Sequence, residues 1–387
     1  MSKKSVLYIV PGEDYEAPKF VGVKRKIKQQ CAAFSNLGYE PTLLYFVKKK
    51  AVFEDINEKK HYYGVSGLMV MCNYYSHIIK RHFKKGKKFD IIYVRKNIET
   101  PLSLYTANIL SKFAEHLIYE IPTYPYDDEY KLSLKKSKGI SKLVKGVGFT
   151  SEKLCRKHLK KHIDYFAVIS VLGEYPTVFG APAIMISNGI NVSDYKPRTW
   201  IPQARIRLLI VANVQHWHGC DRVITGLSNY YANGGTVDIE FNIVGEGRAI
   251  DELRNIVESL DMGTKVLFHG VKSGAELDEI FNDADLGISG LGGYRIGASL
   301  MSALKVRDYC SRGLPYVTAT NDFVIPDDFT WKLQVTNDDT ALDIDSVIEF
   351  YGKCVARINN ISEMRVFAEK NLSWETQIGK ITRMIEK

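Results

Sequence analysis

A glycine-rich loop and the basic helix expected after it carry the residues best suited to chemistry. Residues 290–297 contain four glycines. Within residues 286–308, Asp308 is the only carboxylate, and the cations are Arg295, Lys305 and Arg307. Small residues before a helix let a ligand approach backbone N–H groups, and the helix dipole favours negative charge there. The pattern predicts a site for a nucleoside diphosphate, with cations for the phosphates and Asp308 for the ribose hydroxyls.

The helix that would position these groups is expected over residues 300–311. Ser299 is suited to cap its first turn, while Gly313 and Pro315 are suited to end it. Asp308 follows Lys305 by three residues, so both side chains should lie on one face.

Short apolar runs alternate with helical patterns along the whole chain. In the first half, strands are expected at residues 6–10, 42–47, 91–94, 117–119 and 166–170, and a helix at 21–37. In the second half, strands are expected at 206–211, 237–244, 266–269, 286–289 and 316–318, with helices between them. This alternation predicts an α/β fold with parallel sheets covered by helices on both faces.

The length of 387 residues predicts two domains, each with its own core. Residues 191–204 contain two prolines and little apolar periodicity, so they are expected to form a linker. We expect a first domain over residues 1–195 and a second over 205–370. Residues 371–387 should form a helix that packs back toward the first domain.

Charge is distributed unevenly between the two halves. Residues 1–199 hold 34 Lys and Arg against 18 Asp and Glu, whereas the remainder is net acidic. Residues 131–161 contain eleven Lys and Arg, a single acid, Glu152, and interleaved aliphatic side chains. They could form a solvated helix pair, or a basic amphipathic surface that rests on anionic lipid without inserting. Nucleic acid is a poorer fit, because aromatic residues are sparse here.

Other residues indicate the cellular compartment of the protein and whether it binds a metal ion. The six cysteines are widely spaced and form no C-x-x-C pair, as expected of reduced thiols in the cytoplasm. The first residues do not resemble a secretory signal, and no apolar run approaches the ~18 residues of a membrane span. His216 and His218 lack a third ligand at metal spacing, so no metal site is expected.

Several motifs occur together in a characteristic order over residues 160–387. They are Ser187-Asn188-Gly189 with Asp194-Tyr195-Lys196-Pro197, residues 211–219, Val244-Gly245-Glu246-Gly247, residues 266–270, Asp308 with Gly313-Leu314-Pro315, and Ser373-Trp374. This set resembles the retaining GT-B glycosyltransferases of family four. The resemblance implies two facing Rossmann-like, doubly wound domains with a cleft between them. The first half matches only in architecture, as an acceptor-binding domain would.

The resemblance assigns roles to individual positions. Asp308 stands where the family has the acid that holds the ribose, whereas Leu300 replaces the family's first glutamate. Asn213 and His218 stand where the family clamps the diphosphate with Arg and Lys, and a histidine carries charge only when protonated. Arg295 and Lys305 are expected to replace these cations.

Further positions complete the expected nucleotide-sugar site and the catalytic set. The binding residues would also include Gly22, Gly245, His269, Gly292 and Gly293. The candidate catalytic residues are Glu120, Arg295 and Lys305. Glu120 begins an expected loop, residues 120–129, that contains two prolines and several tyrosines. The aromatic faces of the tyrosines and the carboxylates of this loop suit a sugar.

These roles imply a metal-independent enzyme without a cofactor. It would transfer a sugar from a nucleotide diphosphate sugar, with UDP as the expected nucleotide, to a saccharide acceptor. A lipid-linked acceptor in cell-surface polysaccharide synthesis would explain the basic first half, and would place the protein in the cytoplasm or at the inner face of the cell membrane. The departures at Leu300, Asn213 and His218 leave two alternatives open: a catalytically weak sugar-nucleotide-binding scaffold, or an epimerase of the same fold.

Overall fold

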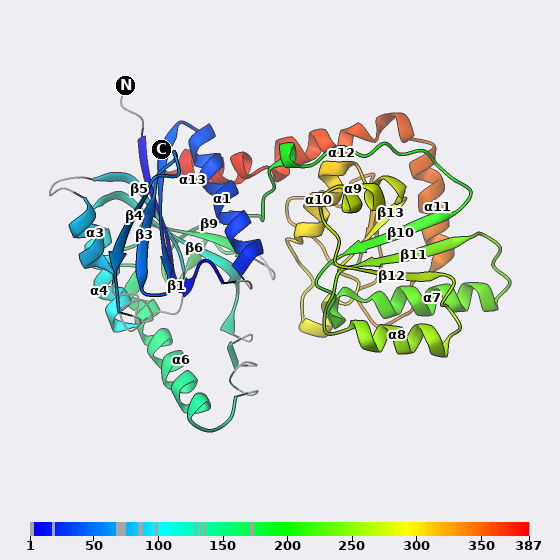
Figure 1. Ribbon diagram of the computed structural model, residues 1–387, viewed down its shortest axis with the longest axis horizontal. Coiled ribbons are helices and arrows are strands. Elements are labelled where there is room, and N and C mark those ends of the chain that lie inside the picture. The colour runs from blue at the N-terminus through cyan, green and yellow to red at the C-terminus, as the bar shows by residue number, and fades with distance from the viewer. Residues whose placement is uncertain are drawn as a thin grey trace. The chain divides into compact units, whose positions relative to one another are not determined.

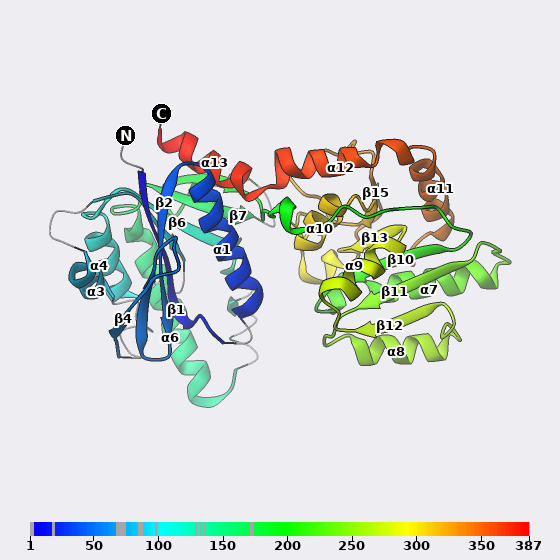
Figure 2. The same ribbon diagram turned by 45° about the horizontal axis from the view of Figure 1, so that its top comes forward.

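The structure is a computed structural model that divides into two compact units. Unit 1 comprises Met1–Ser187 and Trp374–Lys387, and unit 2 comprises Asn188–Ser373. It describes residues 4–17, 20–66, 75–83, 88–96, 100–127, 130–131, 134, 137–170 and 174–386. Each unit is built on its own sheet, with helices packed against it (Figure 1 and Figure 2).

The sheet of unit 1 has the strand order β4-β3-β2-β1-β5-β6-β7-β9-β8. Its parallel strands are β1 (Lys4–Asp14), β2 (Tyr39–Val47), β5 (Phe89–Arg95), β6 (Ala114–Tyr124), β7 (Tyr165–Ser170) and β9 (Ala181–Ile186). Antiparallel strands β3 (Lys50–Glu54), β4 (Lys60–Gly64) and β8 (Thr177–Val178) complete the two edges. The helices are α1 (Val21–Asn36), α3 (Ser76–His82), α4 (Pro101–Leu110), α6 (Gly139–Leu159) and α13 (Trp374–Ile385).

Both faces of this sheet are buried. Leu7 and Ile9 of β1 belong to the core on one face, whereas Val6, Tyr8 and Val10 belong to the core on the other. This explains why β1 appears in the sequence as a continuous apolar run. Helix α13 packs against α1 within unit 1.

Unit 2 has a parallel sheet with the order β12-β11-β10-β13-β14-β15. Its strands are β10 (Ile206–Val211), β11 (Ile239–Val244), β12 (Val266–Gly270), β13 (Leu286–Ser289), β14 (Tyr316–Thr318) and β15 (Lys332–Gln334). Its helices are α7 (Cys220–Ala232), α8 (Ile250–Ser259), α9 (Gly274–Asp283), α10 (Leu304–Arg312), α11 (Ile344–Val355) and α12 (Ser362–Phe367), with short helical turns η3 (His216–His218) and η4 (Gly293–Ile296). The α/β fold expected from the sequence is confirmed in both units.

Two local expectations differ from the structure. Helix α10 begins at Leu304, with Ala303 rather than Ser299 at its N-cap, because Ser299 and Met301 pair with the backbone of Asn321 instead. Residues 191–204 are part of unit 2. Trp200 anchors them, because its indole N–H donates to the carboxylate of Asp285 at 2.7 Å.

Candidate functional site

The candidate site lies in unit 2, where the strand order reverses. Strand β10 pairs with β11 on one side and with β13 on the other, and in such sheets ligands bind beyond the carboxyl ends of the strands. The loops after β10 and β13 meet there through two backbone hydrogen bonds of 3.2 Å. They run from Leu291 N to the His218 carbonyl and from Gly292 N to the Trp217 carbonyl.

Glycines allow this close approach of backbones. A Cβ atom on Gly292 would lie 2.9 Å from the carbonyl oxygen of His216, and one on Gly293 would lie 2.6 Å from that of Ala298. Gly245, with a φ of +120°, would bring a Cβ atom to 1.9 Å from the carbonyl oxygen of Ala212. These predicted site glycines therefore have a packing role that is independent of any ligand.

Lys305 lies in the first turn of α10 and is partly buried. Burial lowers the pKa of its ammonium group to about 8, and the nearby Cys220 thiol only weakly opposes this. Among the residues that the structure describes, none forms a hydrogen bond or ion pair with Lys305. The positive end of the helix dipole adds to the same charge. Lys305 thus provides, where the strand order reverses, a cation without a counter-ion among the residues that the structure describes.

His218, the last residue of η3, lies close enough to Lys305 for their charges to interact. Its Nδ1 accepts from the backbone N–H of Gln215 at 3.1 Å, which leaves the ring proton on Nε2. Burial, followed by the positive charge of Lys305, lowers its pKa to about 3. His218 is therefore neutral near pH 7, and its ring can offer only a neutral N–H donor there.

Asp308 follows Lys305 along α10. Its Oδ1 accepts from Nε of Arg312 at 2.7 Å, and its side chain is 21% exposed. Arg312 also pairs with Asp278 at 2.7 Å, so its charge is shared between two carboxylates. The role of Asp308 toward a ribose stays a prediction.

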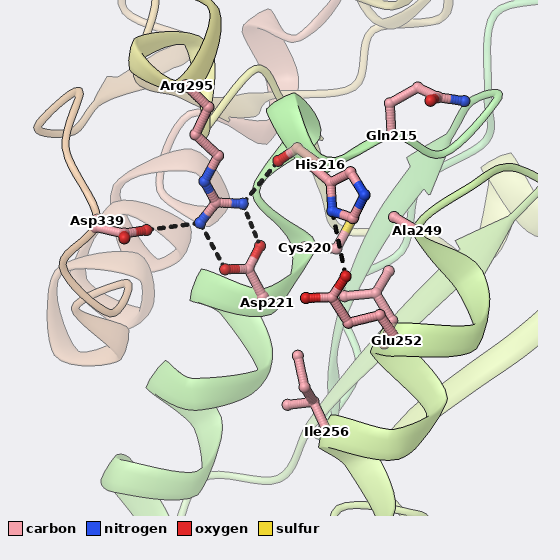
Figure 3. A pocket seen from close by; sticks show the side chains of 10 residues that line it. Gln215, His216, Cys220, Asp221, Ala249, Glu252, Ile256, Arg295 and Asp339 are labelled. Atoms are coloured by element: carbon pink, nitrogen blue, oxygen red, sulfur yellow. Dashed lines mark hydrogen bonds and ion pairs between the residues drawn. The ribbon is translucent and has the colours of Figure 1, made fainter. Parts of the chain in front are cut away.

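The structure ties Arg295 into a network of ion pairs. Its guanidinium donates to both carboxylate oxygens of Asp221, at 2.8 and 2.6 Å, and to Asp339 at 2.7 Å (Figure 3). It also donates to the carbonyl oxygen of His216 at 2.7 Å. The hydrogen bond with Asp221 is the main reason that its pKa is raised. Arg295 therefore joins η4 to the start of α7 rather than presenting an unpaired charge.

A pocket of about 340 Å³ lies beside Arg295, at the first turns of α7 and α8 (Figure 3). Its charged lining consists of one guanidinium, from Arg295, and the carboxylates of Asp221, Glu252 and Asp339. His216 reaches Glu252 at 3.4 Å. An excess of carboxylates repels phosphate, so this pocket is a poor diphosphate site. In the described part of the chain, no group of three or more His, Cys, Asp or Glu side chains could hold a metal ion.

The other predicted residues of unit 2 lie on neighbouring loops. Asn213 is exposed, and its Oδ1 accepts from the Gln215 amide at 2.8 Å. His269, in β12, bonds through Nε2 to Oδ1 of Asn242 at 2.7 Å, and burial lowers its pKa. The structure brings His218 and Lys305 together, whereas Asn213 and His269 have local partners.

Glu120, in unit 1, lies within β6 and is enclosed by its partners. It is 0% exposed, and its carboxylate accepts from Gln30, Tyr93 and Arg95 at 2.6, 2.9 and 2.8 Å. Lys26 lies 3.2 Å from it. Burial alone would raise the pKa of Glu120, but Lys26 and Arg95 outweigh burial and hold that pKa below its usual value. In this structure Glu120 is a buried counter-ion and has no surface to offer a sugar hydroxyl.

Two other features of unit 1 concern the predicted acceptor side. Gly22 lies exposed in the first turn of α1, with no atom within 4 Å of an added Cβ. A pocket of about 220 Å³ lies at the end of β6, and its lining comprises Lys96, Ile121, Pro122, Thr123, Tyr126, Tyr130 and Glu152. It includes part of the tyrosine-rich segment expected to bind a sugar, but that segment is not all loop, because β6 continues to Tyr124. Asp128 and Glu129 of the segment lie outside the described residues.

Comparison with known proteins identifies the fold. The sequence matches no protein-family model and no curated protein. Its structure is similar to sucrose-phosphate synthase from Thermosynechococcus elongatus, with 15% identity, a TM-score of 0.64 and 99% of each chain covered. It is also similar to a glycosyltransferase from Rickettsia africae, with 13% identity, a TM-score of 0.63 and coverage of 100% of this chain and 98% of that one.

A third similar structure is Anabaena Alr3699/HepE in complex with UDP, with 12% identity, a TM-score of 0.61 and 99% of each chain covered. Since these likenesses extend over both units, the chain has the GT-B fold, which consists of two Rossmann-like domains. The fold expected from the sequence is thereby confirmed.

The ion pairs predict different outcomes for two basic residues. Lys305→Met should weaken UDP binding roughly 10- to 100-fold, because a hydrogen bond to a charged group contributes about 1.5–3 kcal/mol. Uridine, which lacks the diphosphate, should bind as before in calorimetric titrations. Arg295→Met is the matched control. It should lower the melting temperature, and any loss of affinity should be the same for UDP as for uridine. Equal losses of UDP and uridine in Lys305→Met would show that Lys305 only shapes the site.

The lowered pKa of Lys305 predicts a pH dependence of UDP affinity. A bound diphosphate favours the ammonium form, so affinity should fall as pH rises through about 8, by up to tenfold per pH unit. Titrations from pH 7 to 10 avoid the phosphate's own pKa near 6. His218→Gln should keep the native profile from pH 5 to 10, since His218 is neutral there. A flat profile for the native protein between pH 7.5 and 9.5 would contradict this assignment.

Glu120→Gln tests the buried cluster of unit 1. The change leaves Lys26 and Arg95 without their shared carboxylate, so unfolding by urea should require about 3–5 kcal/mol less free energy. Tyr93→Phe removes one hydrogen bond to the same carboxylate and should cost only about 1 kcal/mol. A Glu120→Gln variant with native stability but no activity would instead return Glu120 to the catalytic set.

Proposed function

We propose that this protein is a glycosyltransferase that uses a nucleoside diphosphate sugar, with UDP as the expected nucleotide. The observation that carries the proposal is Lys305, in the first turn of α10 at the switch point of unit 2, which has no counter-ion within the described part of the chain. A diphosphate would supply the missing negative charge. The complex of HepE with UDP, a protein of the same fold, supports this choice of ligand.

The residues around Lys305 fit the parts of such a donor. The ammonium group of Lys305 and the positive end of α10 would stabilise the departing diphosphate as the bond to the sugar breaks. His218 would donate its Nε2–H to a phosphate oxygen at any pH above about 4, since its pKa is about 3. Asp308 would accept hydrogen bonds from the ribose hydroxyls, with Arg312 holding its carboxylate in place.

The acceptor is proposed to bind unit 1. The pocket beside Tyr126 and Tyr130 is lined by aromatic side chains and a few polar groups, as small-molecule sites commonly are. We propose a lipid-linked saccharide of a cell-surface polysaccharide pathway as the acceptor. Retention of configuration and independence from metal ions follow from the family resemblance and form part of the proposal.

A donor screen tests this function. The protein should release nucleotide from a UDP-sugar faster than from GDP-, ADP- or TDP-sugars, at a rate that EDTA leaves unchanged. Lys305→Met and Asp308→Asn should each lower this rate at least tenfold, because each removes a charge-assisted contact. Tight UDP binding without turnover of any donor would favour the sugar-nucleotide-binding scaffold. Loss of activity in EDTA would contradict the metal-free mechanism.

A further inference from the structure

Helix α6 of unit 1 carries three large aliphatic side chains that remain in contact with solvent. Leu143, Val147 and Leu154 are 71%, 69% and 61% exposed. They are four and eleven residues apart, close to one and three helical turns, so they form one stripe roughly 17 Å long. Single exposed aliphatics are common on soluble proteins, but an aligned row of them on one helix marks an interaction surface.

The opposite side of α6 anchors the helix to unit 1. Glu152 is 1% exposed and accepts from Lys96 at 2.8 Å and from the Tyr126 hydroxyl at 2.7 Å. Cys155 and Leu159 are also buried. At 100° per residue, Glu152 lies diametrically opposite Leu143. The first half of α6 extends beyond the sheet (Figure 1).

Every charge that α6 presents to solvent is positive. Its only acidic residue is the buried Glu152, whereas Lys142, Lys153 and Lys157 are exposed. These three lysines lie along one flank of the aliphatic stripe, roughly 40–100° away around the helix. Lys135 and Lys136, which were expected to join this surface, lie outside the described residues.

We propose that this stripe docks on an anionic lipid bilayer, with Leu143, Val147 and Leu154 in the interface and the lysines at the headgroups. The positive charge of this surface favours a bilayer over a second copy of the chain as its partner. A second copy would bring lysines against lysines, whereas an anionic bilayer attracts lysines and also accepts aliphatic side chains. No helix in the described part of the chain has the length and apolarity to cross a membrane. The inference adds shallow insertion to the surface contact expected from charge alone.

This inference rests on the proposal that unit 1 binds a lipid-linked acceptor, and it names the membrane surface that unit 1 contacts. Vesicle binding can be measured separately from sugar transfer. Without nucleotide, the full chain should sediment with vesicles of phosphatidylcholine and 30% phosphatidylglycerol, but not with phosphatidylcholine alone. The triple variant Leu143→Ser, Val147→Ser, Leu154→Ser should bind at least tenfold more weakly, with unchanged UDP affinity. Serine at three exposed aliphatic positions of unit 2, Ile201, Val271 and Val366, is the matched control and should bind as the native protein does.

Two further measurements separate insertion from attraction by charge alone. Serine in place of Lys142, Lys153 and Lys157 should also weaken binding, as should 1 M salt, which shortens the screening length to about 3 Å. Brominated acyl chains should quench the tryptophan of a Leu143→Trp variant. Undiminished binding by the Leu143, Val147, Leu154 triple variant, equal binding to neutral vesicles, or absence of binding by the native protein would each overturn the proposal.

Discussion

The constraint on which the candidate site depends is a partly buried ammonium group that has no counter-ion among the described residues. Lys305 lies in the first turn of α10 because the chain before it, at Ser299 and Met301, pairs with Asn321 and delays the start of the helix. The helix dipole therefore has the same sign as the side chain. With Gly292 bringing the β13 loop against η3, the site combines a fixed cation, a helix end and a neutral histidine donor.

Pairing, rather than the number of basic residues, decides which cations remain available. Arg307 is fully buried and paired with Asp322, and Arg295 donates to Asp221 and Asp339. These guanidiniums stabilise the loops that surround Lys305. In unit 1, the carboxylate of Glu120 likewise lies between Lys26 and Arg95. Of the three cations that the sequence offered for the diphosphate, only Lys305 has no counter-ion among the described residues.

Local patterns predicted much of the fold, because strands, helices and their ends depend on nearby residues. The run at residues 6–10 lies within β1, and Gly313 ends α10 with a φ of +75°. Hydrogen-bond and ion-pair partners that are distant in the sequence could not be predicted. Asp221 lies 74 positions from Arg295, and Gln30 lies 90 positions from Glu120, so no spacing rule connects them. The neutral state of His218 depends equally on burial, which a motif does not show.

The lowered pKa of Lys305 makes the stability of unit 2 depend on pH. This pKa is about 8 in the folded protein, against about 10.4 in an unfolded chain. Since the folded pKa is the lower one, the charged group opposes folding below pH 8, by on the order of 3 kcal/mol, and this penalty fades as pH rises toward 10. A bound anion would stabilise the ammonium form and so recover part of that free energy as affinity. Desolvation of this ammonium group would thus favour an anionic ligand over a neutral one, because only an anion relieves it.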